Sequence, residues 1–109
     1  MELVLNGFLH ESHEAQTLNN GTELKRLIIK VPPRVNQFGE AIGETNYFEV
    51  TIFKKEKINE FMEGINAELA MKGLQKLKVA CYVNGSERLF NDKKFYNVTL
   101  NVKSLQWIK

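Results

Sequence analysis

The amino-acid sequence predicts an all-β fold, a single small barrel of five strands with one α-helix between the third and fourth strands. Three observations lead to this prediction. The chain has 109 residues, a length that suits one hydrophobic core and therefore one domain, 1–109. Apolar and polar residues alternate in several separate segments, as half-buried strands require. The segment before the fourth strand changes to helical spacing, and no repeat or linker divides the chain.

The first two strands are predicted at residues 2–9 and 24–31. The first is an apolar run interrupted by Gly7, which indicates a bend or bulge. In the second, apolar residues recur at every other position, and Pro32-Pro33 ends it. Residues 34–45 contain two glycines and read as a long loop.

Residues 46–53 form the third predicted strand, and residues 56–72 form the helix. In the strand, one face holds Phe48, Val50 and Ile52. In the helix, apolar residues recur at intervals of three and four, which predicts one buried stripe. That stripe comprises Ile58, Phe61, Met62, Ile65 and Leu69, and Gly73 is the expected C-terminal stop.

The last two strands are predicted at residues 76–83 and 95–102. Asn84-Gly85-Ser86 is a turn signal, so residues 84–94 are expected to form a hairpin tip. The only cysteine, Cys81, lies on the apolar face of the fourth strand and reads as a small buried hydrophobe. Five strands with one helix before the fourth is the order of the OB-fold, a Greek-key barrel in which the helix plugs one end.

Basic charge is concentrated in two segments, although the net charge of the chain is only +2. Residues 25–34 hold four Lys or Arg and no acid, and residues 76–109 hold seven against Glu87 and Asp92. If the fold brings the two segments together, they form a positive groove suited to nucleic acid. The alternative is two separate solvated strand faces.

Two aromatic residues of the third strand, Tyr47 and Phe53, lie on the face that is not needed for the core. Leaving Phe53 in water forgoes roughly 1.5–3 kcal/mol of burial. A subunit interface would recover that energy, and so would a stacked base of single-stranded nucleic acid, which contributes roughly 1–3 kcal/mol. An isolated exposed ring, or one that touches the long loop, is the remaining alternative.

Several segments resemble, in order, those of the bacterial single-stranded DNA-binding protein family. Residues 4–9, Val-Leu-Asn-Gly-Phe-Leu, resemble the opening strand of the family. Residues 45–54, Thr-Asn-Tyr-Phe-Glu-Val-Thr-Ile-Phe-Lys, resemble its Thr-Glu-Trp-His-Arg-Val-Val-Leu-Phe-Gly segment. Residues 72–79 resemble its Lys-Gly-Ser-Gln-Val-Tyr-Ile motif, and Lys94-Phe95-Tyr96 its charged turn before the last strand.

The resemblance implies an OB-fold that binds single-stranded DNA in replication, recombination or repair, with little sequence preference. Tyr47 and Phe53 fall where the family has stacking aromatics, Phe90 falls near another, and Arg34 and Phe38 lie in a loop that makes further contacts in the family. Family members assemble through the first strand, so Met1–Leu9 is the expected contact of a dimer or tetramer. The expected phosphate contacts are Lys25, Arg26, Lys30, Arg34, Lys54, Arg88, Lys93 and Lys94.

The chain also departs from the family pattern. It shows no Gly/Pro-rich tail with an acidic tip, the segment with which the family recruits repair and replication enzymes, so the resemblance does not extend to that recruitment. A short, divergent member would suit a plasmid, a phage or a mobile element, or a replication-restart accessory role. An OB-fold protein-interaction module and an RNA-binding OB domain remain alternative functions.

The sequence contains no complete catalytic, metal-binding or targeting motif. His10 and His13 have no further histidine to complete a metal site, and Cys81 lacks a polar setting. No Gly-rich phosphate loop is found. We therefore expect no enzyme activity, cofactor, metal or small-molecule substrate. The N-terminus has no signal peptide or membrane span, which favours a cytoplasmic protein without a membrane partner.

Overall fold

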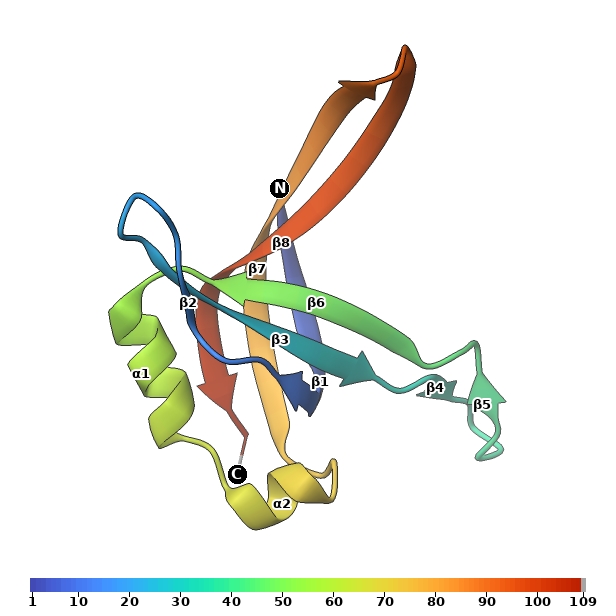
Figure 1. Ribbon diagram of the computed structural model, residues 1–109. Coiled ribbons are helices and arrows are strands. Elements are labelled where there is room, and N and C mark those ends of the chain that lie inside the picture. Colours follow the sequence, from blue (N-terminus) through green and yellow to red (C-terminus); the bar gives the residue numbers. More distant parts are fainter. Residues whose placement is uncertain (109) are drawn as a thin grey trace.

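Five long strands close into a barrel in the computed structural model, which describes residues 1–108 (Figure 1). Around the barrel the order is β1-β7-β8-β6-β3, and pairing of β1 with β3 closes it. The pairings are antiparallel except for the parallel contact of β6 with β8. The predicted five-stranded all-β barrel is thus confirmed. The long strands are β1 (Glu2–Ser12), β3 (Glu23–Val31), β6 (Asn46–Ile52), β7 (Lys76–Phe90) and β8 (Lys93–Trp107).

Three short strands lie outside the barrel. β2 (Gln16–Thr17) pairs with the start of β3. β4 (Arg34–Val35) and β5 (Ala41–Ile42) form a small hairpin that projects from the barrel where a structureless loop was predicted (Figure 1). The Asn36 side chain holds its tip by accepting hydrogen bonds from the backbone N–H groups of Phe38 and Glu40, both at 2.9 Å.

The predicted single helix over 56–72 is wrong, because two helices are present: α1 (Lys55–Glu63) and α2 (Ala67–Met71). The break lies at Gly64, and the buried side chain of Gln75 occupies it. Gln75 donates to the Gly64 carbonyl at 2.7 Å and accepts from the Asn66 N–H at 3.0 Å, which satisfies backbone groups that a continuous helix would have paired. Within residues 1–108, neither helix has the length and apolarity needed to cross a membrane.

The expected end of the helical region is confirmed at Gly73, which follows α2 with φ +67°. The predicted apolar stripe is confirmed only in part. Ile58 and Phe61 of α1 are buried, whereas Met62 is 50% exposed and Leu69 is 40% exposed. Ile65, between the two helices, and Ala70 of α2 are partly buried against the core, so the helical region contributes mainly through the side of α1 that covers the end of the barrel.

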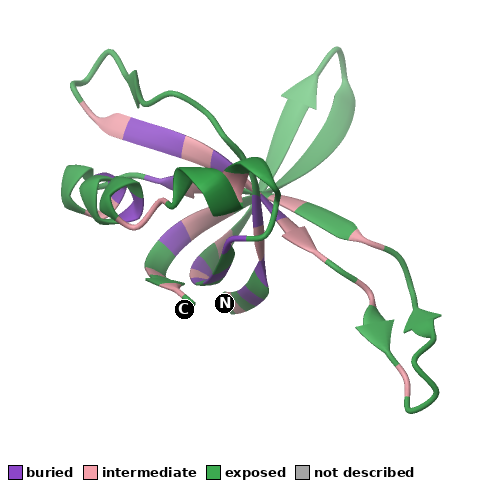
Figure 2. Ribbon diagram, turned by 90° about the horizontal axis from the view of Figure 1, so that it is seen from below, coloured by how far each residue is buried: buried purple, intermediate pink, exposed green. Residues whose placement is uncertain are grey.

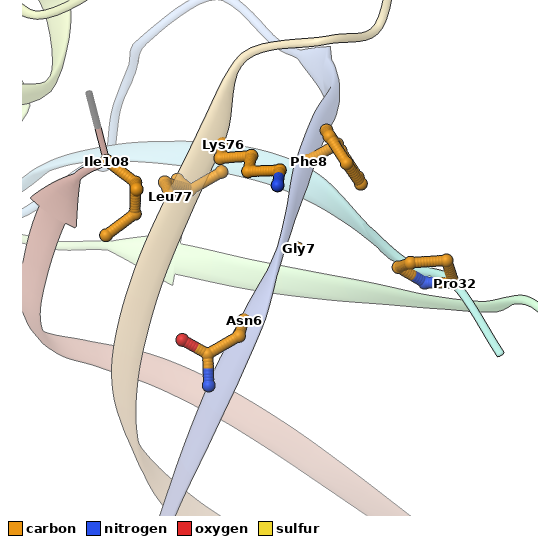
Figure 3. Close-up of a pocket in the computed structure, with 7 residues that line it drawn as sticks. All are labelled: Asn6, Gly7, Phe8, Pro32, Lys76, Leu77 and Ile108. Carbon is orange, nitrogen blue, oxygen red and sulfur yellow. The ribbon is translucent and has the colours of Figure 1, made fainter. Parts of the chain in front are cut away.

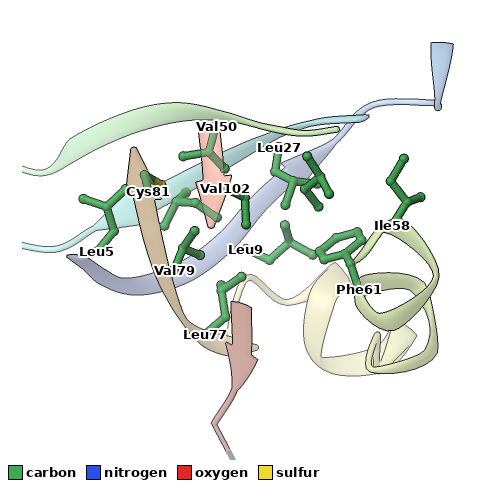
Figure 4. Close-up of a cluster of buried hydrophobic side chains, with 12 residues drawn as sticks. Leu5, Leu9, Leu27, Val50, Ile58, Phe61, Leu77, Val79, Cys81 and Val102 are labelled. Carbon is green, nitrogen blue, oxygen red and sulfur yellow. The ribbon is translucent and has the colours of Figure 1, made fainter. Parts of the chain in front are cut away.

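Inward side chains of every long strand fill the barrel, and α1 closes one end of it (Figure 4). Phe61 stacks on Trp107 of β8 with ring centroids 5.3 Å apart. Cys81 is fully buried, as predicted, and burial raises the pKa of its thiol to about 11. The core comprises Leu5, Leu9, Leu27, Ile29, Val50, Ile52, Ile58, Phe61, Leu77, Val79, Cys81 and Val102.

β7 and β8 extend well beyond the barrel as a long two-stranded hairpin whose residues are mostly exposed (Figure 2). The predicted turn at Asn84-Gly85-Ser86 is wrong, because those residues continue the strand. The turn lies at Asn91 and Asp92, which adopt φ of 50° and 63°. Two consecutive residues with positive φ form the tight turn that suits the twist of a hairpin.

Gly7 does not form the predicted bulge. The irregularity in β1 lies between Leu9 and Glu11, so His10 is the extra residue. Gly7 instead lies against the carbonyl of Lys30, where any Cβ would overlap the backbone oxygen. The first strand therefore needs glycine at this position for close approach to β3.

Lys25 is buried, although it was predicted to contact phosphate. It lies on the inward face of β3 and is only 6% exposed. Its ammonium donates to the His13 carbonyl at 2.6 Å and lies 5.9 Å from the centre of the Phe61 ring. This amine is therefore held by the fold and is not presented to a ligand.

Gly7→Ala is expected to lower the free energy of unfolding by roughly 1–3 kcal/mol, because the backbone of β3 must move to admit the methyl group. Urea denaturation measures the effect. Gly85→Ala is the matched control, since Gly85 is also within a strand and has open space around the position of a Cβ. Equal stability of the two variants would contradict the close approach of β1 to β3.

Lys25→Ala is expected to destabilise the protein by roughly 1–3 kcal/mol, because it removes buried methylenes and the hydrogen bond to His13. Lys30→Ala on the outer face of the same strand serves as the control and is expected to change stability by less than about 0.5 kcal/mol. Thermal or urea unfolding distinguishes the two. If Lys25→Ala is as stable as Lys30→Ala, the burial of Lys25 is wrong.

Candidate nucleic-acid interface

Tyr47 lies on the outer face of β6, and Phe53, which was predicted on the same face, follows the last residue of that strand. Val50 and Ile52 are fully buried, whereas Tyr47 is 54% exposed and Phe53 is 40% exposed. Phe53 lies just past the end of β6, directly before Lys54, which occupies the N-cap position of α1 without a side-chain hydrogen bond to it. The predicted alternation is confirmed, and both rings lie outside a core that is already filled.

Tyr47 is flanked by one residue of the adjacent strand β3 and one of β1, the strand beyond it. Lys30 of β3 lies directly opposite Tyr47 in the antiparallel register. His10, the extra residue at the bulge in β1, places its ring 4.9 Å from the Tyr47 ring at an angle of 57°. A bulge can redirect a side chain in this way, and the ring contact of His10 was not predicted from the sequence.

The basic residues near this face differ in their exposure and in the polar contacts that they already make. Arg26 lies opposite Thr51 and is shared between Glu49, at 3.8 Å, and the Gln16 side chain, at 3.1 Å. Both contacts are at the surface, where such pairs contribute about 0–1 kcal/mol, so a phosphate can compete for Arg26. Lys30 is half-buried, whereas Arg34 on the β4–β5 hairpin and Lys54 are exposed.

The long hairpin gathers a second group of the predicted residues. Arg88 pairs with Phe95, and Phe90 pairs with Lys93, so these four side chains share one face. A hollow of about 320 Å³ is lined by Arg88, Phe90, Phe95 and Asn97. Phe95 was not among the predicted site residues, because the turn was placed too early. Reading Asn91-Asp92 as the turn would have paired Phe95 with Arg88.

The opposite face of the hairpin is continuous with the barrel interior. Tyr96 and Val98 lie there and are 71% and 70% exposed, because the hairpin at that height has no barrel to cover it. Lys94 shares this face and lies 3.7 Å from Glu87, so it points away from Phe90. The structure thus separates Lys94 from the other hairpin candidates.

An apolar groove of about 470 Å³ lies where the hairpin leaves the barrel. Tyr47 reaches this groove from β6, and Val98 and Leu100 line it from β8. Tyr47 is therefore connected with the Tyr96 side of the hairpin, and Phe90 lies on the other side. The remaining lining comes from Met1, Glu2, Leu3, Phe48, Glu49 and Val83.

Solved single-stranded DNA-binding proteins share the whole of this architecture. Rim1, the mitochondrial single-stranded DNA-binding protein of S. cerevisiae, matches with a TM-score of 0.72 and 17% identity over 99% of this chain and 93% of that chain. The small single-stranded DNA-binding protein of Streptomyces coelicolor matches with a TM-score of 0.68 and 12% identity, over 99% and 94% of the two chains.

A third structure, the Plasmodium falciparum single-stranded DNA-binding protein in complex with single-stranded DNA, matches with a TM-score of 0.64 and 12% identity over 99% of this chain and 94% of that chain. No protein-family model and no curated protein sequence matches this chain. The likeness extends over the full barrel and its hairpin, and it confirms the predicted OB-fold. The chain has the fold of the single-stranded DNA-binding proteins.

Proposed function

We propose that this protein binds single-stranded DNA with little sequence preference. The observation that carries the proposal is the exposure of Tyr47 and Phe53 on the outer face of a barrel whose core is complete. Single-stranded DNA offers flat bases that stack on such rings, and every base has a face that can do so. The three solved structures that share the fold are single-stranded DNA-binding proteins, which supports the same ligand.

Phosphate contacts accompany the stacking. On the β3–β6 face, Lys30 lies opposite Tyr47 and Arg26 lies opposite Thr51. Lys54 follows Phe53, and Arg34 extends from the β4–β5 hairpin. On the long hairpin, Arg88 and Lys93 flank Phe90 and supply charge to a second stacking position. Lys94 has a weaker claim, since it faces the other side with Glu87.

Binding of this kind requires no reaction, metal or cofactor. A protein that covers single strands acts wherever duplex DNA is opened, so its place is in replication, recombination or repair. A cytoplasmic site of action is part of this proposal.

Tyr47→Ala and Phe53→Ala are each expected to weaken the binding of labelled oligo-dT by roughly 1–3 kcal/mol, the contribution of one stacked base. Fluorescence anisotropy measures the affinity, and thermal unfolding is expected to show little change because both rings lie outside the core. Met71→Ala on α2, an 89% exposed apolar residue, is the control and is expected to bind as the unsubstituted protein does.

Two outcomes would overturn the proposal. The first concerns salt. Phosphate contacts release counterions, so binding of oligo-dT must weaken as salt rises, and either no binding at low salt or binding that is insensitive to salt would contradict the proposal. The second is that Tyr47→Ala and Phe53→Ala bind as Met71→Ala does. Oligo-rU that displaces oligo-dT at equal concentration would reassign the ligand to RNA.

A homo-oligomer, assembled through β1, is the second part of the proposal. β1 pairs with β7 over Glu2–Phe8 but with β3 only from Phe8 onwards. Among residues 1–108, the other backbone edge of the segment before Phe8 has no strand partner, and an open edge can pair with a second copy. The apolar groove beside Met1, Leu3 and Val98 continues this edge and would be covered in the same contact.

Val98→Lys is expected to shift the protein toward its single-chain mass of 12.6 kDa in sedimentation experiments, because it places a charge in the apolar groove. Met71→Lys on α2 is the control and is expected to leave the mass unchanged. Sedimentation of the unsubstituted protein as a single chain at high concentration would contradict the proposed assembly.

A further inference from the structure

A row of alternating aromatic and basic residues crosses four strands of the barrel. Tyr47 of β6 lies opposite Lys30 of β3, Lys30 lies opposite Phe8 of β1, and Phe8 lies opposite Lys76 of β7. Directly opposed residues of antiparallel strands point to the same side of the sheet. We call these four residues, Tyr47, Lys30, Phe8 and Lys76, the girdle.

The girdle lies on the outside of the barrel along its whole length. Gly7 and Leu9 on either side of Phe8 are buried, and so are Ile29 beside Lys30 and Leu77 beside Lys76. Since neighbouring positions in a strand point to opposite faces, the girdle residues point outward. Tyr47 and Lys76 are exposed, and Phe8 and Lys30 are half-buried. Strands are spaced by about 4.8 Å, so Lys30 and Lys76 lie about 10 Å apart around the wall.

A cavity lies at the Phe8–Lys76 end of the girdle. A hollow of about 390 Å³ lies against Phe8 and Lys76, and the amide of Asn6 reaches it from β1 (Figure 3). The Lys76 ammonium lies 5.6 Å from the centre of the Phe8 ring. An aromatic face, an amide and a cation around one hollow suit a base with its phosphate.

The charge around this end is positive. Lys78 lies two residues beyond Lys76 on the same outer face and pairs with Asn6, which lines the hollow. Farther along this face, six residues from Lys76, Tyr82 pairs with Glu2, whose carboxylate is held by Lys103 at 2.7 Å. A second copy packed flat on this surface would bring lysines against lysines, whereas a polyanion complements them.

We propose that single-stranded DNA leaves the β3–β6 face along the girdle and continues over β1 and β7, with Phe8 as a further stacking residue and Lys76 as a further phosphate contact. This inference rests on the proposed function and extends it to the opposite side of the barrel. β7 is separated from β6 by β8 and from β3 by β1, so the single-stranded DNA would pass about half-way around the barrel.

The test compares Lys76→Gln and Phe8→Leu with Lys72→Gln, using labelled oligo-dT long enough to pass around the barrel. Lys72 is a matched control, because its ammonium is paired with Glu68 on α2 at 3.2 Å. The slope of log affinity against log salt is expected to become shallower by roughly 0.7 in Lys76→Gln, the loss of one phosphate on a single strand, and to stay unchanged in Lys72→Gln. Phe8→Leu is expected to bind about fivefold or more weakly.

The outcomes separate this inference from the function on which it rests. If Tyr47→Ala weakens binding while Lys76→Gln retains the full salt slope and Phe8→Leu the full affinity, the girdle is wrong and the function stands. If the unsubstituted protein does not bind oligo-dT, both are wrong. A change of mass in sedimentation by Lys76→Gln would assign this face to subunit contact and also overturn the girdle. Should Phe8→Leu fail to fold, the salt slope of Lys76→Gln decides alone.

Discussion

The small volume inside the barrel is the constraint on which the rest of the structure depends. The inward side chains of the five strands, together with Ile58 and Phe61 of α1, already fill it. Packing at crystal-like density leaves no room for the large rings of Tyr47 and Phe53, so both stay on the outside. An outer wall that carries rings and cations together follows from this constraint, and it is the feature that the proposed ligand uses.

The same constraint explains the long hairpin. Beyond the barrel, the inward face of β7 and β8 has nothing to cover it, so Tyr96 and Val98 are exposed on one side and Phe90 and Phe95 on the other. A hairpin with two apolar faces can contact a ligand with one and a second subunit with the other. Tyr47 joins the Tyr96 side through the apolar groove, so that the proposed stacking residue and the proposed subunit contact adjoin one another.

The parts of the strands that form the barrel and the outward ring of Tyr47 could be predicted from the sequence, because alternation is a local property and the core face of each strand is mostly apolar within the barrel. The break at Gly64 could not, because helical spacing continues through Ile65 and the buried Gln75 that stabilises the break comes from beyond both helices. The burial of Lys25 was also missed, since a lysine beside Arg26 reads as surface and only the folded chain brings His13 to its ammonium. The girdle depends on register across four strands, which no single segment encodes.

Ring resonances in an NMR titration with oligo-dT test the central claim most directly. The account predicts that the ring protons of Tyr47 and Phe53 shift as bases stack on them. The ring resonances of buried Phe61 and half-buried Trp107, which pack on each other at the closed end of the barrel, are predicted not to shift. Saturation with oligo-dT that leaves the Tyr47 and Phe53 resonances unmoved would contradict the account.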